Sequence, residues 1–441
     1  MVSFWERDAV AAKGVCYKHP AVGTDPSFEL EASLANAVSE AFEREQVPWL
    51  ATLVDQPSHT LARDDVELAA SLVDVLADEV GLVRELHHDP RGRFAAHRVY
   101  STGLAREPTH AMLLVGHVDT VHPRASGFVH FQRGSAGGQA RDVARGPGVL
   151  DMKSGLSIVL FAIKALRRCA PELLDALPLR FVCNTDEEVG SPSSRSLFEL
   201  LAPITSMALV FEAGRNHDRI VTRRKGGGTF EIRVRGREAH AANDHANGVS
   251  AIHVLARMID RLEALTDYER GLTVNVGLCE GGSAKNTVPG AASCTVDARF
   301  STSEAAREFT RTLDELVREV HAELPKRLRA AVLELSGSIT RPPMQPGPGT
   351  DALRERYEAC AVAYGLGGGE APLQGGGSDA NLLAVCGVPC IDGLGPFGER
   401  YHTHEEWCSL TSLERKTKTL TCFLSRVARG QGEAQSREIH E

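Results

Sequence analysis

The segment AMLLVGHVDT at residues 111–120 indicates the fold class of this chain. Its five consecutive apolar residues, 111–115, predict a strand buried on both faces, as in a parallel sheet covered by helices. Further apolar strands are predicted at 179–183 and 207–211, with an amphipathic helix at 155–168 between strands. Strands that alternate with helices predict an α/β domain with a mostly parallel sheet and helices on both faces.

The pattern changes near residue 222. Residues 229–235 alternate between apolar and charged side chains, which is typical of a strand with one exposed face. There follow, in order, a helix at 249–265, strands at 272–278 and 292–300, a helix at 303–324 and a strand at 331–335. This β-α-β-β-α-β order predicts a ferredoxin-like domain. We therefore predict an α/β domain in two parts, 1–221 and 341–441, interrupted by an inserted domain at 222–340.

Composition excludes several classes of function. The 441 residues are 42% hydrophobic and 24% charged, which is ordinary for a globular protein. A formal net charge of −9 disfavours partners such as nucleic acid or an anionic membrane surface, and no apolar run reaches the roughly 18 residues of a membrane helix. The ten cysteines form no CxxC pair, and the first ten residues lack the apolar core of a secretory signal. We therefore expect a cytoplasmic protein with reduced thiols.

Five polar motifs follow predicted strands or lie at loop junctions. They are GHVDT at 116–120, LDMKSG at 150–155, TDEEVGS at 185–191, FEAG at 211–214 and YHTHEEW at 401–407. The carboxyl ends of strands in an open α/β sheet are where ligand sites collect. Each motif by itself also fits a surface or helix-capping role. The combination is more specific than any one motif.

Together the motifs supply two imidazoles and three carboxylates without thiols: His117, Asp151, Glu188, Glu212 and His402. This set exceeds what one tetrahedral zinc ion takes, and it fits two divalent cations if one carboxylate bridges them. Two such ions and one hydroxide balance the three carboxylate charges, which avoids uncompensated charge in a partly dry cleft. In an extended backbone Asp119 points the same way as His117 and can orient its imidazole.

These motifs resemble those of the dinuclear zinc hydrolases that include bacterial glutamate carboxypeptidase, aminoacylase, acetylornithine deacetylase, succinyl-diaminopimelate desuccinylase and cytosolic tripeptidase. The resemblance covers residues 45–430 in order. It implies that Asp151 bridges two metal ions, that His117 and Glu212 complete one site, and that Glu188 and His402 complete the other. Two Zn²⁺ ions per chain are expected, although Co²⁺ or Mn²⁺ would tolerate the same ligands.

The resemblance also assigns the catalytic groups. It implies that Asp119 orients a ligand imidazole and that Glu187 is the general base. The motif YHTHEEW offers His404 as a second candidate for the last ligand, but the spacing to Glu406 favours His402.

The inserted domain carries the remaining family features. RKGGGTFEIRVRGREAHA at 224–241 resembles the entry into the family's lid or dimerisation domain, and His240 corresponds to the histidine that reaches a partner's active site. Asn286 of NTVP and Arg299 of DAR resemble contacts to the substrate carboxylate. Gly376 lies in a turn whose glycines let the backbone approach substrate closely. The resemblance implies a homodimer, while His240 and Arg299 also fit a strand-end cap and a surface charge.

The implied reaction is hydrolysis of the amide bond of an N-acyl amino acid or a short peptide with a free C-terminal carboxylate, by water that two metal ions activate. Within the family, the alternative is an acetylornithine- or succinyl-diaminopimelate-type deacylase. Outside it, GGSDA at 376–380 nearly forms a nucleophile elbow around Ser378, which with His402 would indicate a serine hydrolase. A binding protein without metals and, from GLGGG at 365–369, a nucleotide-binding protein are weaker alternatives.

Overall fold

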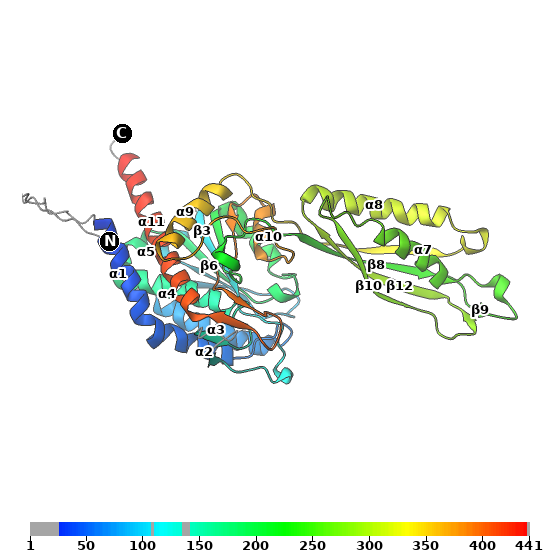
Figure 1. Ribbon diagram of the computed structural model, residues 1–441, viewed down its shortest axis with the longest axis horizontal. Coiled ribbons are helices and arrows are strands. Elements are labelled where there is room, and N and C mark those ends of the chain that lie inside the picture. The colour runs from blue at the N-terminus through cyan, green and yellow to red at the C-terminus, as the bar shows by residue number, and fades with distance from the viewer. Residues whose placement is uncertain (1–25, 107–109, 135–141, 439–441) are drawn as a thin grey trace, which may run out of the picture.

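The computed structural model describes residues 26–106, 110–134 and 142–438. The chain forms two units that lie end to end and are joined by two crossings (Figure 1). We call them the body, which contains the elements before β8 and after β13, and the insert, which runs from β8 to β13. No helix within the described ranges has both the length and the apolar content that a membrane crossing requires. Residues 1–40 match no segment of the family that the motifs resemble, and residues 1–25 lie outside the described part.

The body is built on a six-stranded sheet in the order β1-β2-β6-β3-β7-β14. The strands are β1 (Val83–His87), β2 (His97–Ser101), β6 (Leu179–Asn184), β3 (Ala111–His117), β7 (Thr205–Val210) and β14 (Cys390–Ile391). β3 pairs in parallel with β6 and β7, and β7 pairs in parallel with β14, whereas β1 and β2 are antiparallel. The predicted α/β class with a mostly parallel sheet is confirmed.

Helices cover both faces of this sheet. They are α1 (Pro26–Ala41), α2 (Val47–Asp55), α3 (Arg63–Glu79), α4 (Lys153–Cys169), α5 (Pro171–Asp175), α6 (Arg195–Leu201), α9 (Thr350–Ala363), α10 (Asp379–Val385) and α11 (Leu410–Glu438). β3 shows how two cores arise from one strand. Met112 and Leu114 pack into the core formed with α4 and α11, whereas Leu113 and Val115 pack into the core formed with α6 and α10. Alternation of side chains along a strand explains this division.

The insert has a separate antiparallel sheet in the order β10-β12-β8-β13. Its strands are β8 (Gly226–Arg235), β10 (Thr273–Gly281), β12 (Ala291–Phe300) and β13 (Val332–Arg341). α7 (Ala251–Glu263) and α8 (Ser303–Ala322) cover one face (Figure 1), where Phe230, Phe300 and Phe309 pack together. The predicted ferredoxin-like arrangement is confirmed. Beyond this sheet, β9 (Ala239–His240) and β11 (Thr287–Val288) pair at the end farthest from the body.

A second small sheet in the body joins segments far apart in the sequence. The Gly-, Ser- and Arg-rich content of residues 132–148 predicts a surface loop, but β4 (Gln132–Gly134) and β5 (Val143–Arg145) form there. β5 pairs with β16 (Trp407–Ser409), which pairs in turn with β15 (Gly398–Glu399). β4 pairs with its neighbour β5, whereas the pairing of β5 with β16 joins segments more than half the chain apart, which local composition does not predict. This sheet lies beside two of the polar motifs.

Candidate metal centre

Parallel strands bring three of the polar motifs to one edge of the body sheet. β3 lies between β6 and β7, and all three strands run in the same direction. His117 ends β3, Glu187 and Glu188 begin a short 3₁₀ turn after β6, and Glu212 follows the end of β7. The side chains meet at the carboxyl edge, where open α/β sheets bind ligands.

Asp151 lies at the centre of the resulting cluster. Its Oδ1 is 3.3 Å from Nε2 of His117, and its Oδ2 is 3.3 Å from Nε2 of His402. Each imidazole nitrogen also faces a further carboxylate, at 3.7 Å for His117 and Glu212 and at 3.1 Å for His402 and Glu188. The two oxygens of Asp151 therefore face two separate imidazole–carboxylate pairs.

These groups fit a divalent metal. Ligand atoms of His117, Asp151 and Glu188 lie within 4.8 Å of one another, and so do those of His117, Glu187 and Glu212. His117 Nε2 and Glu188 Oε1 are buried without a hydrogen-bond partner in the described ranges. Buried polar atoms without a partner are rare and need an explanation, which a metal ion supplies. Nitrogen and oxygen donors without thiolate suit zinc, cobalt or manganese.

Burial and the charges of neighbouring groups shift the pKa values in this cluster. Burial, with repulsion from Asp151, raises the pKa of Glu188 to about 8 and that of Glu212 well above its usual range. Contacts with Asp151 and Glu188 raise the pKa of His402 to about 11. Although burial opposes the shift, contacts with His117 and His402 hold the pKa of Asp151 well below its usual range. Positive charge is therefore favoured at this site, and divalent cations would supply it.

Asp119 holds two parts of the cluster in position. Its Oδ1 is 3.3 Å and its backbone oxygen 3.0 Å from Nδ1 of His117. Its carboxylate also accepts hydrogen bonds from the backbone amides of Glu187 and Glu188, at 3.3 and 3.2 Å, and from the hydroxyl of Thr60 at 2.7 Å. Because Asp119 contacts Nδ1 of the His117 imidazole, Nε2 of that imidazole remains available to bind a metal ion.

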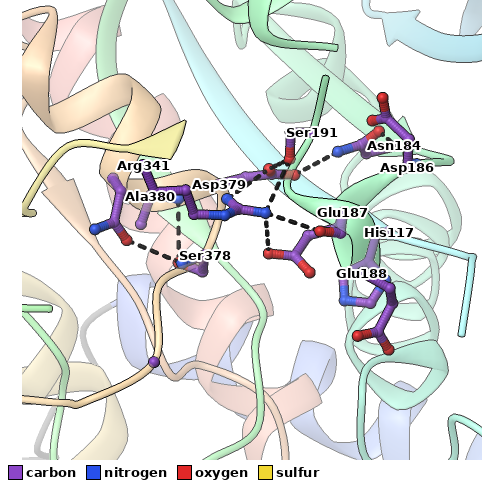
Figure 2. Close-up of polar contacts among 12 residues, drawn as sticks. His117, Asn184, Asp186, Glu187, Glu188, Ser191, Arg341, Ser378, Asp379 and Ala380 are labelled. Atoms are coloured by element: carbon purple, nitrogen blue, oxygen red, sulfur yellow. Dashed lines mark hydrogen bonds and ion pairs between the residues drawn. The ribbon is translucent and has the colours of Figure 1, made fainter. Parts of the chain in front are cut away.

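Arg341 contacts the cluster although no sequence motif identified it. It ends β13, where the chain returns from the insert to the body. Its Nη2 donates to Oε1 of Glu187 at 2.6 Å and to the backbone oxygen of Glu187 at 2.8 Å (Figure 2). Its guanidinium also contacts Ser191 and Asp379. Burial raises the pKa of Glu187 to about 7 against the opposing charge of Arg341. The only sequence signal near Arg341 is the Pro-Pro pair that follows it, which predicts a domain boundary and not a site residue.

His402, and not His404, lies in the cluster. The ring of His404 stacks on Phe128 with 5.3 Å between the ring centroids. Glu406, grouped with these histidines in the sequence motif, is buried. Its carboxylate accepts hydrogen bonds from the backbone amides of the loop that ends at Asp151. The sequence alone could not distinguish a ligand from a residue that supports the loop.

A pocket of about 700 Å³ opens beside the cluster, between the body and the insert. Its lining includes Glu187, Glu188 and His402 from the body and Thr229, Arg299 and Ser338 from the insert. The Arg299 guanidinium pairs with both carboxylate oxygens of Asp297, at 2.7 and 2.8 Å. Gly377 belongs to the lining, while Gly376 is exposed and its carbonyl accepts a hydrogen bond from Arg224.

His240 and Asn286 lie together, far from the cluster. β9 and β11 pair at the end of the insert opposite the body, with His240 opposite Thr287 (Figure 1). His240 is exposed, and its Nδ1 accepts hydrogen bonds from the amides of Ala242 and Asn243. Asn286 is also exposed, and its carbonyl accepts from the amide of Ala241. We call the pair of His240 and Asn286 the insert tip. Within one chain it does not meet Arg299.

Ser378 does not have the surroundings of a nucleophile. It is buried at the start of α10, where its hydroxyl accepts from the amide of Ala380 and donates to Asp392 at 2.6 Å. His402 faces carboxylates instead of this hydroxyl. The serine-hydrolase alternative is therefore wrong.

Comparisons with known proteins show which proteins this chain is similar to. Residues 222–325 match the family model described as a peptidase dimerisation domain. Carboxypeptidase G2 of Pseudomonas sp. (strain RS-16) is 28% identical over 307 residues, which cover 69% of this chain and 71% of that protein. Acetylornithine deacetylase of Myxococcus xanthus is 34% identical over 226 residues, which cover 49% of this chain and 56% of that protein.

Solved structures share the fold. Aminopeptidase PepT from Bacillus cereus has a TM-score of 0.70 at 20% identity, covering 87% of this chain and 98% of that chain. An M20 family metallo-carboxypeptidase from Sulfolobus solfataricus has a TM-score of 0.67 at 16% identity, covering 86% and 98%. The fold is that of the M20 family metallopeptidases. The chain is similar in sequence to carboxypeptidase G2 and acetylornithine deacetylase, and the resemblance carried by its motifs is confirmed.

Proposed function

We propose that this protein is a dinuclear metal-dependent amidohydrolase that cleaves N-acyl amino acids or short peptides with a free C-terminal carboxylate. One observation carries the proposal: the two oxygens of Asp151 face two different imidazoles, each with its own further carboxylate. Such an arrangement suits two cations that share a bridging carboxylate. The sequence relatives, carboxypeptidase G2 among them, support the reaction class.

The ligands would divide between two ions. His117, Asp151 and Glu212 would hold one, and His402, Asp151 and Glu188 would hold the other, with Zn²⁺ as the first candidate and Co²⁺ or Mn²⁺ tolerated. When bound, the ions lower the pKa of water toward about 7 and polarise the amide carbonyl.

Glu187 is the proposed general base. Its carboxylate lies beside His117 and Glu212 and also lines the pocket. In the proposed mechanism it accepts the proton of the attacking water and returns that proton to the leaving amine. The contact with Arg341 fixes the direction of this carboxylate. Asp119 orients the imidazole of His117.

Substrate binding is assigned to both units. Arg299 in the pocket would bind the substrate carboxylate, since a guanidinium pairs with a carboxylate through two parallel hydrogen bonds. Gly376 adjoins the pocket lining. We propose a homodimer in which the insert tip, with His240 and Asn286, contributes residues to the substrate pocket of the partner subunit. His240 would donate a hydrogen bond to the oxyanion and Asn286 would contact the substrate. The match to a peptidase dimerisation domain supports this arrangement.

The test combines metal analysis with a substrate panel. Purified protein is stripped with a chelator, reloaded with Zn²⁺ and assayed on N-acyl amino acids, dipeptides and acylated diamino acids, with the C-terminal amides as matched controls. We expect two ions per chain by elemental analysis, activity only after reloading, and no cleavage of the amidated controls. Fewer than two ions in the reloaded protein contradicts the dinuclear site. Preference for acylated diamino acids would favour the biosynthetic deacylase alternative.

A further inference from the structure

The buried carboxylate of Glu406 has four polar contacts, three with backbone amides of the loop that ends at Asp151 and one with His122. Its Oε1 accepts hydrogen bonds from the backbone amides of Leu150 at 2.7 Å and Asp151 at 3.0 Å. Its Oε2 accepts from the amide of Gly148 at 3.1 Å and lies 3.1 Å from Nε2 of His122. The residue is 1% exposed. A buried carboxylate is costly unless hydrogen bonds satisfy it, and here both oxygens are satisfied.

The position of Glu406 in the fold links two parts of the metal centre. It directly precedes β16, whose Trp407 pairs with Arg145 of β5. β5 leads into the loop that ends at Asp151. In the other direction, a tight turn connects Glu406 to His402, with hydrogen bonds from the amide of Thr403 to Arg400 and from the amide of Glu406 to Thr403. One side chain thus joins the segment that carries His402 to the backbone of Asp151.

Because one of these hydrogen bonds is to the amide of Asp151, Glu406 does more than hold the loop in place. A hydrogen bond to the amide of Asp151 fixes the orientation of its backbone, and the backbone sets the direction of the side chain. That side chain faces His117 with one oxygen and His402 with the other, both at 3.3 Å. Small rotations at Asp151 would change both distances at once.

We propose that Glu406 is a positioning residue for the dinuclear centre: it sets the separation of Asp151 and His402 before metal binds and so raises the affinity for the ion between them. The inference rests on the proposed function. Residues that hold metal ligands in place typically contribute 10- to 100-fold in metal affinity or activity. We expect an effect of that size from Glu406, although it touches neither ion nor substrate.

The chain offers a matched control in the preceding residue. Glu405 has the same side chain, but its carboxylate is 74% exposed and its nearest cation, Arg400, is 4.0 Å away. Glu405→Gln and Glu406→Gln therefore make the same chemical change one residue apart. In Glu406→Gln the amide oxygen can keep the contacts with Leu150 and Asp151, whereas its NH₂ group replaces the oxygen that accepts from Gly148. Glu406→Gln therefore weakens the hydrogen bonding to the loop at Gly148 without leaving a cavity.

The experiment titrates chelator-stripped full-length protein with Zn²⁺ in competition with a chromophoric chelator, and records Co²⁺ absorption spectra as a second readout. We expect two ions in the wild type and in Glu405→Gln, with affinities within twofold of each other. In Glu406→Gln we expect the weaker-binding ion to lose roughly 10- to 100-fold in affinity, with a changed Co²⁺ spectrum. Urea unfolding of the metal-free proteins measures whether stability alone has changed.

The outcomes separate this inference from the proposed function. A wild type that binds fewer than two ions rejects the dinuclear centre itself. A wild type that binds two, with Glu406→Gln binding both within twofold of it, rejects the positioning role. If Glu406→Gln does not fold, the same Zn²⁺ titration is made on Glu406→Asp, which keeps the charge on a shorter side chain. Wild-type affinity in a folded Glu406→Asp variant would make Glu406 a structural residue only, and a loss of at least tenfold supports positioning.

Discussion

The two groups of proposed site residues differ in how they are assembled. His117, Asp151, Glu188, Glu212 and His402 converge in the body and contact one another within one chain. The insert tip is exposed and lies at the opposite end of the molecule (Figure 1). The comparison teaches that one chain can contain all residues of the proposed metal centre but only part of the proposed substrate site. Four variants, in order of expected effect, test this division.

Glu187→Gln tests the body side and has the largest expected effect. The amide cannot accept the proton of the attacking water, so we expect kcat to fall by roughly 100- to 10,000-fold. The Gln oxygen can still accept from Arg341, so the fold and both metal ions should remain. Steady-state kinetics and elemental analysis on the same sample check this. Turnover within tenfold of wild type would remove Glu187 from the role of base.

His240→Ala tests the insert tip. Loss of a hydrogen bond to the oxyanion typically costs 100-fold or more, so we expect kcat to fall by about 100-fold with metal content unchanged. The decisive measurement is complementation. Glu187→Gln and His240→Ala proteins, mixed and allowed to exchange subunits, form mixed dimers in which one pocket has both an intact base and an intact tip.

The expected recovery follows from subunit statistics. Equal mixing makes about half of the dimers mixed, each with one working pocket, so activity should return to about a quarter of wild type. Mixing two preparations that both carry His240→Ala is the control and should recover nothing. No recovery from the first mixture, despite subunit exchange, would mean that His240 does not serve the partner.

Arg299→Gln tests the insert residue that does line the pocket. A hydrogen bond to a charged group contributes about 1.5–3 kcal/mol, so we expect KM for a substrate with a free carboxylate to rise by about tenfold or more. The C-terminal amide of the same substrate should bind equally poorly to both proteins. Equal effects on the acid and the amide would contradict carboxylate binding by Arg299.

Asp297→Asn has the smallest expected effect and the opposite sign. Asp297 occupies the guanidinium of Arg299 with two hydrogen bonds and therefore competes with the substrate carboxylate. Because exposed ion pairs contribute about 0.2–1 kcal/mol, we expect KM to fall by up to about fivefold at low salt, and less at high salt. A rise in KM would show that Asp297 aids binding by orienting Arg299.

The sequence predicts the residues whose positions follow from strand order. His117, Glu188 and Glu212 each follow an apolar strand, and parallel neighbours β6, β3 and β7 must deliver them to one edge. The spacing of apolar residues changes along the sequence between the patterns of strands and of helices, and these changes likewise predict both sheets. These features depend on local patterns, which a single sequence contains.

The residues that the sequence does not identify are those whose roles depend on long-range contacts. Arg341 reaches Glu187 only because β13 ends at the crossing between the two units. Glu406 has the composition of a metal ligand, yet its partners are backbone amides, which leave no sequence signal. Short strands β5 and β16 form only because their partners meet in the fold.

The location of the insert within the chain affects how a new molecule is made. Asp151, His117, Glu188 and Glu212 precede the insert, whereas His402 and Glu406 follow it. At the usual synthesis rate of about 5–20 residues per second, the stretch between Glu212 and His402 takes roughly 10–40 s. Throughout that interval the nascent body carries its acidic groups without the second imidazole. If the proposed centre binds two ions, its full loading is therefore a late step in the biogenesis of each molecule.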